Sequence, residues 1–219
     1  MRLTDPVDSY CERLDPGYWA EPVNALTNLA FLLAAAVMAA RLRRQPVPLG
    51  RAQAGMLAVV GLGSYLFHTH AQVWAGIADM LPILGFILLY LYAVNRHVWG
   101  IGRWGALALT ALFLPYAALL APVFGRLGMG SSAGYAPVPL LILLYALAIR
   151  HRAPAIARGW ALGAGVLIVS LGFRMLDQPL CGLWPLGTHP MWHLLNAAML
   201  GWMIEVYRRA LIPGAARQG

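Results

Sequence analysis

The chain has 219 residues, of which 60% are apolar and only 11% are charged. A soluble domain normally carries about 25% charged residues, so this composition excludes a water-soluble globular protein and indicates a chain whose solvent is lipid. The net charge of +8 does not indicate a nucleic-acid partner, because all 16 basic residues are Arg and most stand between apolar runs, where they set membrane topology.

Seven apolar runs follow one another along the chain, and each approaches the roughly 20 residues that cross a bilayer as a helix. They predict an all-α membrane protein, a bundle of seven transmembrane helices. The expected helices cover residues 24–40, 53–67, 77–94, 104–124, 136–149, 159–175 and 189–207. We therefore expect a single domain over residues 1–219, in which an extracytoplasmic N-terminal segment (1–23) precedes the bundle (about 24–209).

The Arg residues divide unevenly between the two sides of this bundle. Twelve lie on the side that holds the first, third and fifth connections and the C-terminal tail: Arg41, Arg43, Arg44, Arg51, Arg96, Arg103, Arg150, Arg152, Arg158, Arg208, Arg209 and Arg217. The other four are Arg2, Arg13, Arg126 and Arg174. Because cytoplasmic loops collect Arg, the N-terminus is predicted outside and the C-terminus in the cytoplasm. A chain with Arg but no Lys is typical of a GC-rich bacterial genome, so we expect the bacterial inner membrane.

Three histidines at the outer ends of the expected helices form a candidate zinc site. His189 and His193 are four residues apart, so they share one face of a helix and can bind one Zn²⁺. His68 closes the second run and adds a third nitrogen from another helix. Three His ligands with one open position are the ligand set of a catalytic zinc site.

Two further polar residues are expected at the same level of the bundle. Asp79, at the start of the third run, could act as a general base for a zinc-bound water. Ser64 precedes His68 by four residues, and its hydroxyl could donate to a developing oxyanion. Each residue also has a structural interpretation, as a helix N-cap for Asp79 and a backbone-bonded hydroxyl for Ser64. Ser64, Asp79 and the three histidines come from three expected helices and meet at one level of the bundle, which favours a functional site over these structural interpretations.

The N-terminal segment carries a second group of candidate ligands. Asp8, Glu12, Asp15 and Glu21 are hard oxygen ligands at irregular spacing, which suits Ca²⁺ and does not match an EF-hand. A solvated acidic segment explains the same pattern equally well.

Cys11 and Cys181 are the two cysteines, and the predicted topology places both outside the cytoplasm. Disulfides persist in a bacterial periplasm, so a bridge is favoured over the alternative of two unpaired thiols.

Five short segments, in order along the chain, resemble those of a known family. They are Tyr10-Cys11-Glu12, residues 20–28 (Ala-Glu-Pro-Val-Asn-Ala-Leu-Thr-Asn), residues 63–69 (Gly-Ser-Tyr-Leu-Phe-His-Thr), Asp79 with Pro82, and residues 187–193 (Gly-Thr-His-Pro-Met-Trp-His). Together they resemble the alkaline ceramidase family, within the larger group of seven-helix membrane hydrolases that includes adiponectin receptors.

The resemblance implies roles for most of these residues. His68, His189 and His193 would be the zinc ligands, Asp79 the water-activating base and Ser64 the oxyanion partner. A disulfide is implied at Cys11 and Cys181. A calcium site is implied with Glu12 and Glu21 as ligands. Because Ser9-Tyr10 stands where the family has an Asp-Trp pair and Leu14 replaces an Asn, that site would be remodelled around Asp8 and Asp15.

The sequence thus predicts a zinc-dependent amidohydrolase that cleaves a ceramide-like N-acyl lipid into a fatty acid and a long-chain amine. The expected cofactor is Zn²⁺, with Ca²⁺ as a second candidate, and the expected partner is a membrane lipid. The oligomeric state is left open. Two alternatives remain, a membrane receptor or structural protein with a stabilising zinc site, and a lipid-remodelling esterase.

Overall fold

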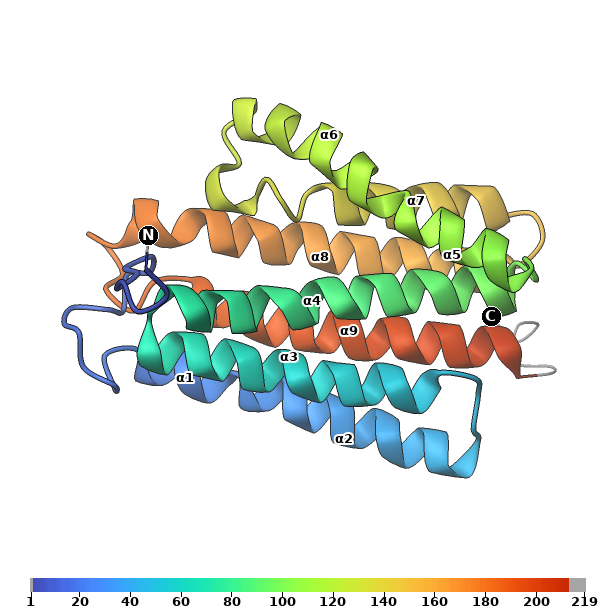
Figure 1. Ribbon diagram of the computed structural model, residues 1–219, viewed down its shortest axis with the longest axis horizontal. Coiled ribbons are helices and arrows are strands. Elements are labelled where there is room, and N and C mark those ends of the chain that lie inside the picture. Colours follow the sequence, from blue (N-terminus) through green and yellow to red (C-terminus); the bar gives the residue numbers. More distant parts are fainter. Residues whose placement is uncertain (1, 213–219) are drawn as a thin grey trace.

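The computed structural model describes residues 2–212, which form a bundle of helices that run along one long axis (Figure 1). In chain order the elements are α1 (Pro22–Thr27), α2 (Leu29–Arg44), α3 (Gly50–His70), α4 (Val73–Ala93), a π-helical turn η1 (Val94–Val98), α5 (Arg103–Ala111), α6 (Phe113–Arg126), a short 3₁₀ turn η2 (Gly130–Ser132), α7 (Pro137–Ile149), α8 (Pro154–Leu180) and α9 (His189–Leu211). Because α1 continues into α2 and α5 into α6, the described chain has seven long helical segments.

This arrangement confirms the predicted all-helical bundle, and each of the seven apolar runs lies in one segment. By length and composition, four stretches could cross a membrane: Pro22–Arg44, Val73–Val98, Arg103–Arg126 and Pro154–Leu180. The α7 helix is apolar but has only 13 residues. The α3 and α9 helices have 21 and 23 residues, and they carry the histidines and other polar side chains that dilute their apolar character. The four apolar stretches indicate a membrane-embedded protein.

Helix α9 is the centre of the bundle, where it packs against α8, α2 and α3. The core around it includes Trp160, Ile204 and Tyr207, each at most 1% exposed. Large side chains such as Leu119 and Leu147 point outward instead and are more than half exposed. Apolar side chains on both the inside and the outside are expected for a bundle whose solvent is lipid.

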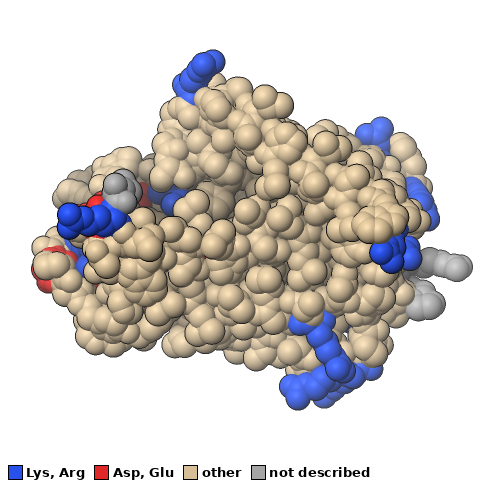
Figure 2. Space-filling view, viewed as in Figure 1, with Lys and Arg blue, Asp and Glu red and all other residues tan. Residues whose placement is uncertain are grey.

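The two ends of the bundle differ in charge. Blue Arg side chains gather near the end of the bundle where the C-terminus lies, and red Asp and Glu side chains gather near the N-terminus (Figure 2). Glu205 is the acidic residue at the Arg-rich end, where its carboxylate pairs with Arg41, Arg208 and Arg209 at 2.8–3.2 Å. Arg217, which belongs to the sequence-based Arg count, lies outside the described residues.

Helices α3 and α4 form a close antiparallel pair at the N-terminal end of the bundle. A side-chain carbon on Gly63 would collide with the backbone carbonyl of Ala78, so only glycine allows this approach. The connection between them is a tight turn in which Ala71 has a positive φ of 44°. The last turn of α3 and the first turns of α4 are therefore fixed against each other, and these are the turns that carry the predicted site.

Candidate metal centre and adjoining cavity

Three buried histidines meet at the N-terminal end of the bundle, as the sequence predicted. His68 lies in the last turn of α3, and His189 and His193 lie in the first turns of α9. None is more than 1% exposed, and one ligand atom from each lies within 4.8 Å of the others. Nδ1 of His189 and Nε2 of His193 are buried without a hydrogen-bond partner among the described residues. Buried unpartnered imidazole nitrogens that converge are suited to hold a metal ion.

Two of the three imidazoles, those of His68 and His193, are oriented by a hydrogen bond to Nδ1, the ring nitrogen that faces away from the other histidines. Nδ1 of His68 lies 2.6 Å from Oε2 of Glu21, and Nδ1 of His193 lies 2.8 Å from Oγ1 of Thr27. The Thr27 hydroxyl is within 2.9 Å of the Val23 carbonyl, so it can donate there and accept from His193. Both rings then carry their proton on Nδ1 and present the Nε2 lone pair inward, the tautomer that a metal requires.

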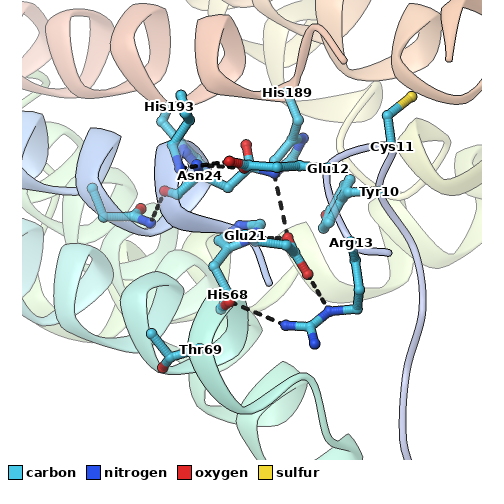
Figure 3. A network of polar contacts seen from close by, with 12 residues as sticks. Tyr10, Cys11, Glu12, Arg13, Glu21, Asn24, His68, Thr69, His189 and His193 are labelled. Atoms are coloured by element: carbon cyan, nitrogen blue, oxygen red, sulfur yellow. Dashed lines mark hydrogen bonds and ion pairs between the residues drawn. The ribbon is translucent and has the colours of Figure 1, made fainter. Parts of the chain in front are cut away.

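Arg13 holds Glu21 in place behind His68 (Figure 3). Its Nε donates to Oε1 of Glu21 at 2.5 Å, and its Nη2 donates to the carbonyl of His68 at 3.2 Å. Nη1 reaches the carbonyls of Asp15 and Gly17 at 3.2 and 3.4 Å. The guanidinium is thus surrounded by oxygen atoms, and it connects the N-terminal segment to a metal-facing histidine.

Asp177 fixes the start of α9 from the end of α8. Its carboxylate accepts the backbone N–H groups of Thr188 and His189 at 2.7 and 2.8 Å, and that of Cys11 at 3.0 Å. A carboxylate at a helix N-terminus satisfies free N–H groups and interacts favourably with the helix dipole. Asp177 was not predicted from the sequence, in which its one signal is an acid twelve residues before His189.

The N-terminal segment is attached to the site by a covalent bond and a ring contact. Cys11 and Cys181 form a disulfide, which confirms the predicted bridge. The ring of Tyr10 stacks on His189 with 3.7 Å between centroids. The backbone N–H of Val7 donates to the Ala71 carbonyl at 2.7 Å. The segment is thus part of the site.

The acidic residues predicted to bind calcium have other partners. Glu12 accepts the N–H groups of Val23 and Asn24 at the start of α1, at 2.6 and 2.8 Å. Burial raises the pKa of both Glu12 and Glu21, and the Arg13 contact partly offsets this for Glu21. Asp8 and Asp15 are exposed. Among the described residues, the three histidines lie close enough together to hold a metal ion. The four carboxylates do not form such a group. Calcium binding stays a prediction.

Asp79 lies deeper in its helix than the sequence indicated. The α4 helix begins at Val73, because it starts directly after the tight turn at Ala71, so Asp79 is in the second turn and does not cap the helix. The Ser64 hydroxyl forms a hydrogen bond with the Asp79 carboxylate. The structure therefore brings together Ser64 and Asp79, but Asp79 does not belong to the group of side chains whose ligand atoms lie within 4.8 Å of one another.

A cavity of about 600 Å³ lies near the histidines, although none of the three is among the residues that line it. Asp79 and Arg174 line it, together with Tyr10 and Phe67, whose rings contact His189 and His68. A second cavity of about 60 Å³ has only apolar lining area and shares Ile87, Phe113 and Val138 with the first. The two cavities therefore lie next to each other. We call them together the apolar passage, and Asp79 lies in its wall near the three histidines.

A protein-family model described as Ceramidase matches residues 9–211, which is nearly the whole chain. A search of curated proteins found no match. The family match covers the disulfide, the three histidines, Ser64 and Asp79, and the chain belongs to the Ceramidase family.

Proposed function

We propose that the protein is a zinc-dependent amidohydrolase that cleaves the amide bond of ceramide-like N-acyl lipids, releasing a fatty acid and a long-chain amine. The observation that carries this proposal is the group of three buried histidines, with unpartnered nitrogens, in a chain of the Ceramidase family. Three neutral nitrogen donors favour zinc over magnesium or calcium, which prefer oxygen ligands.

His68, His189 and His193 would hold the metal, and the residues behind them fix their orientation. A bound Zn²⁺ supplies an acidified water and polarises the amide carbonyl. Asp79 accepts the proton of the attacking water and returns it to the leaving amine, because it is the carboxylate that lines the cavity. Ser64 donates a hydrogen bond to the Asp79 carboxylate, which positions it for this transfer.

The cavity supports a lipid substrate. Its walls are mostly apolar, and the smaller cavity continues them toward Trp160 and Met203 in the middle of the bundle. An acyl chain can occupy this passage with its amide beside Asp79, against the rings of Tyr10 and Phe67. Burial of each CH₂ group contributes about 0.8 kcal/mol, so a long chain binds far better than a short one.

We further propose that residues 1–219 form one domain with seven membrane spans, the N-terminus outside and the C-terminus in the cytoplasm. The distribution of Arg supports this orientation, since the Arg-rich end holds the C-terminus. The metal centre then lies at the outer face of the bacterial inner membrane, where a disulfide such as Cys11–Cys181 persists.

The test is hydrolysis of a panel of N-acyl lipids and matched esters by purified protein, with zinc quantified in the same sample. We expect stoichiometric zinc, amide cleavage, and loss of both in His193→Ala. His151→Ala, an exposed histidine in the α7–α8 connection, is the matched control and should change neither. Zinc without turnover would favour a receptor or structural protein. Cleavage restricted to esters would favour a lipid-remodelling esterase, and protein without zinc would refute the hydrolase.

A further inference from the structure

The wall of the larger cavity carries one positively charged side chain, that of Arg174, which has no role in the proposed reaction. Asp79 and Arg174 are the charged residues among the described side chains that line it. Arg174 lies in α8, six residues before the helix ends at Leu180. It was counted from the sequence as a topology signal, yet it stands within an apolar run and faces the inside of the bundle. A fixed charge inside a membrane bundle is costly and marks a functional position.

Arg174 is surrounded by aromatic side chains. Its Nη1 donates to the Tyr10 hydroxyl at 2.9 Å. Its guanidinium carbon lies 5.7 Å from the ring centre of Tyr10, and 5.3 Å from those of Tyr135 and Trp192. These cation–π contacts stabilise the charge without neutralising it.

One edge of the guanidinium is left without a partner. Nε is buried and has no hydrogen bond, and no described residue accepts a bond from Nη2. No described carboxylate, not even that of Asp79, forms an ion pair with Arg174, for which an oxygen would have to lie within 4.0 Å of a guanidinium nitrogen. Arg stays charged at all relevant pH values. Nε therefore still requires an acceptor, and Arg174 is one of the residues that line the cavity.

The free edge identifies the acceptor by its chemistry. Nε and Nη2 present two parallel N–H groups, which match the two oxygens of a carboxylate in a bidentate pair. The hydroxyl groups of a neutral ceramide-like lipid offer no such pair of charged acceptors. Because Arg174 and Asp79 line the same cavity, the anion would stand close to the scissile amide.

We propose that Arg174 recognises a carboxylate next to the scissile amide, so that the preferred substrates are N-acyl amino acids. This inference rests on the proposed amidohydrolase activity and changes the amine that is released, from the long-chain amine of a ceramide-like lipid to an amino acid. The acyl chain occupies the apolar passage, the amide lies beside Asp79, and the carboxylate of the amino acid meets the Nε–Nη2 edge of Arg174. Hydrolysis adds water across the C–N bond and releases a fatty acid and a free amino acid.

The first experiment compares matched substrates with the same acyl chain: N-palmitoyl glycine, its methyl ester and N-palmitoyl ethanolamine. N-palmitoyl phosphoethanolamine tests whether a phosphate can replace the carboxylate. We expect the wild-type protein to favour N-palmitoyl glycine over both neutral lipids by roughly 10–100-fold in KM, the scale of charge-assisted hydrogen bonds. Arg174→Gln should lose this preference and keep its activity on N-palmitoyl ethanolamine. Arg126→Gln, an exposed arginine, is the control and should behave as wild type.

Three results would overturn the proposal. The first is wild-type protein without preference for the anionic lipid, and the second is a preference for the phosphate-bearing lipid over the carboxylate. The third is an equal loss on all substrates in Arg174→Gln, which would make Arg174 a counter-charge for Asp79. Arg174→Lys separates charge from geometry, because it keeps the charge but loses the bidentate edge, and it should recover less than half of the preference in logarithmic terms.

Binding of the same lipids, measured by thermal shift, separates this proposal from the activity on which it rests. If no amide is cleaved but N-palmitoyl glycine still stabilises the wild-type protein more than Arg174→Gln, the hydrolase proposal fails and the recognition of the carboxylate stands. If amides are cleaved and Arg174→Gln binds and cleaves like wild type, the recognition fails and the hydrolase stands.

Discussion

Replacement of Arg13 by Gln should weaken both the fold and the metal centre. The substitution removes the guanidinium that pairs with Glu21, and both side chains are at most 5% exposed. Removing one partner of a buried ion pair destabilises by about 3–5 kcal/mol, because the other charge stays buried without compensation. Glu21 in turn orients His68, and loss of such an outer partner lowers metal affinity about 10–100-fold.

Two measurements test these magnitudes in detergent-solubilised protein. Competition with a zinc chelator gives the metal affinity, and denaturant or thermal unfolding gives the stability. Arg44→Gln, an exposed arginine at the opposite end of α2, should change neither quantity. The double variant Arg13→Gln with Glu21→Gln should regain part of the stability, because the uncompensated carboxylate is removed while an amide oxygen can still accept from His68.

The calcium prediction is tested in the same series. Calcium could restore zinc affinity to Arg13→Gln and have no effect on the wild-type protein. That result would show that the Arg13 guanidinium supplies, among the oxygen atoms around it, the positive charge that calcium supplies in its absence. A wild-type protein whose stability or zinc affinity rises with calcium would instead support the predicted calcium site. Arg13→Gln with unchanged zinc affinity would contradict the role given to the guanidinium.

Three further predictions follow from the site and its placement. Asp79→Asn should keep its zinc and lose on the order of 10²–10⁴ in rate, and full activity would show that another group takes the proton. Thiol labelling of unreduced, denatured protein should find Cys11 and Cys181 unreactive, and reduction should lower stability by roughly 2–4 kcal/mol; two reactive thiols would contradict the bridge. A reporter after Arg208 should be cytoplasmic and one before Asp5 periplasmic, and the reverse result would invert the proposed orientation.

The helices were predictable from the sequence because apolar runs are their direct physical cause in lipid, but their ends were not. The run at 159–175 became α8 (Pro154–Leu180), since the helix continues through polar residues at both ends. Asp79 shows the consequence for the site. The start of α4 is set by the positive φ of Ala71, which no apolar pattern signals, so Asp79 moved from an expected helix start into the second turn.

The histidines were predictable because helical spacing and helix ends placed all three at one level of the bundle. Residues that act through tertiary contacts were not. Arg13 was counted as a topology signal, although it lies inside the site, because its position next to Glu12 does not reveal its contacts with Glu21 and His68. Arg174 offered a clearer signal, a charge within an apolar run, that the Arg count concealed.

The positions of the three buried histidines along the chain determine when the candidate metal centre can form during synthesis. His68 emerges early on the ribosome, whereas His189 and His193 belong to the last helix, which is made after the other six segments. Until α9 is made, the chain has His68 with its partners Glu21 and Arg13 but neither of the other two histidines, and Cys11 lacks its partner until residue 181 has been made. A ribosome-bound chain that ends before α9 therefore lacks two of the three histidines, so the candidate metal centre can form only after this last described helix has been made.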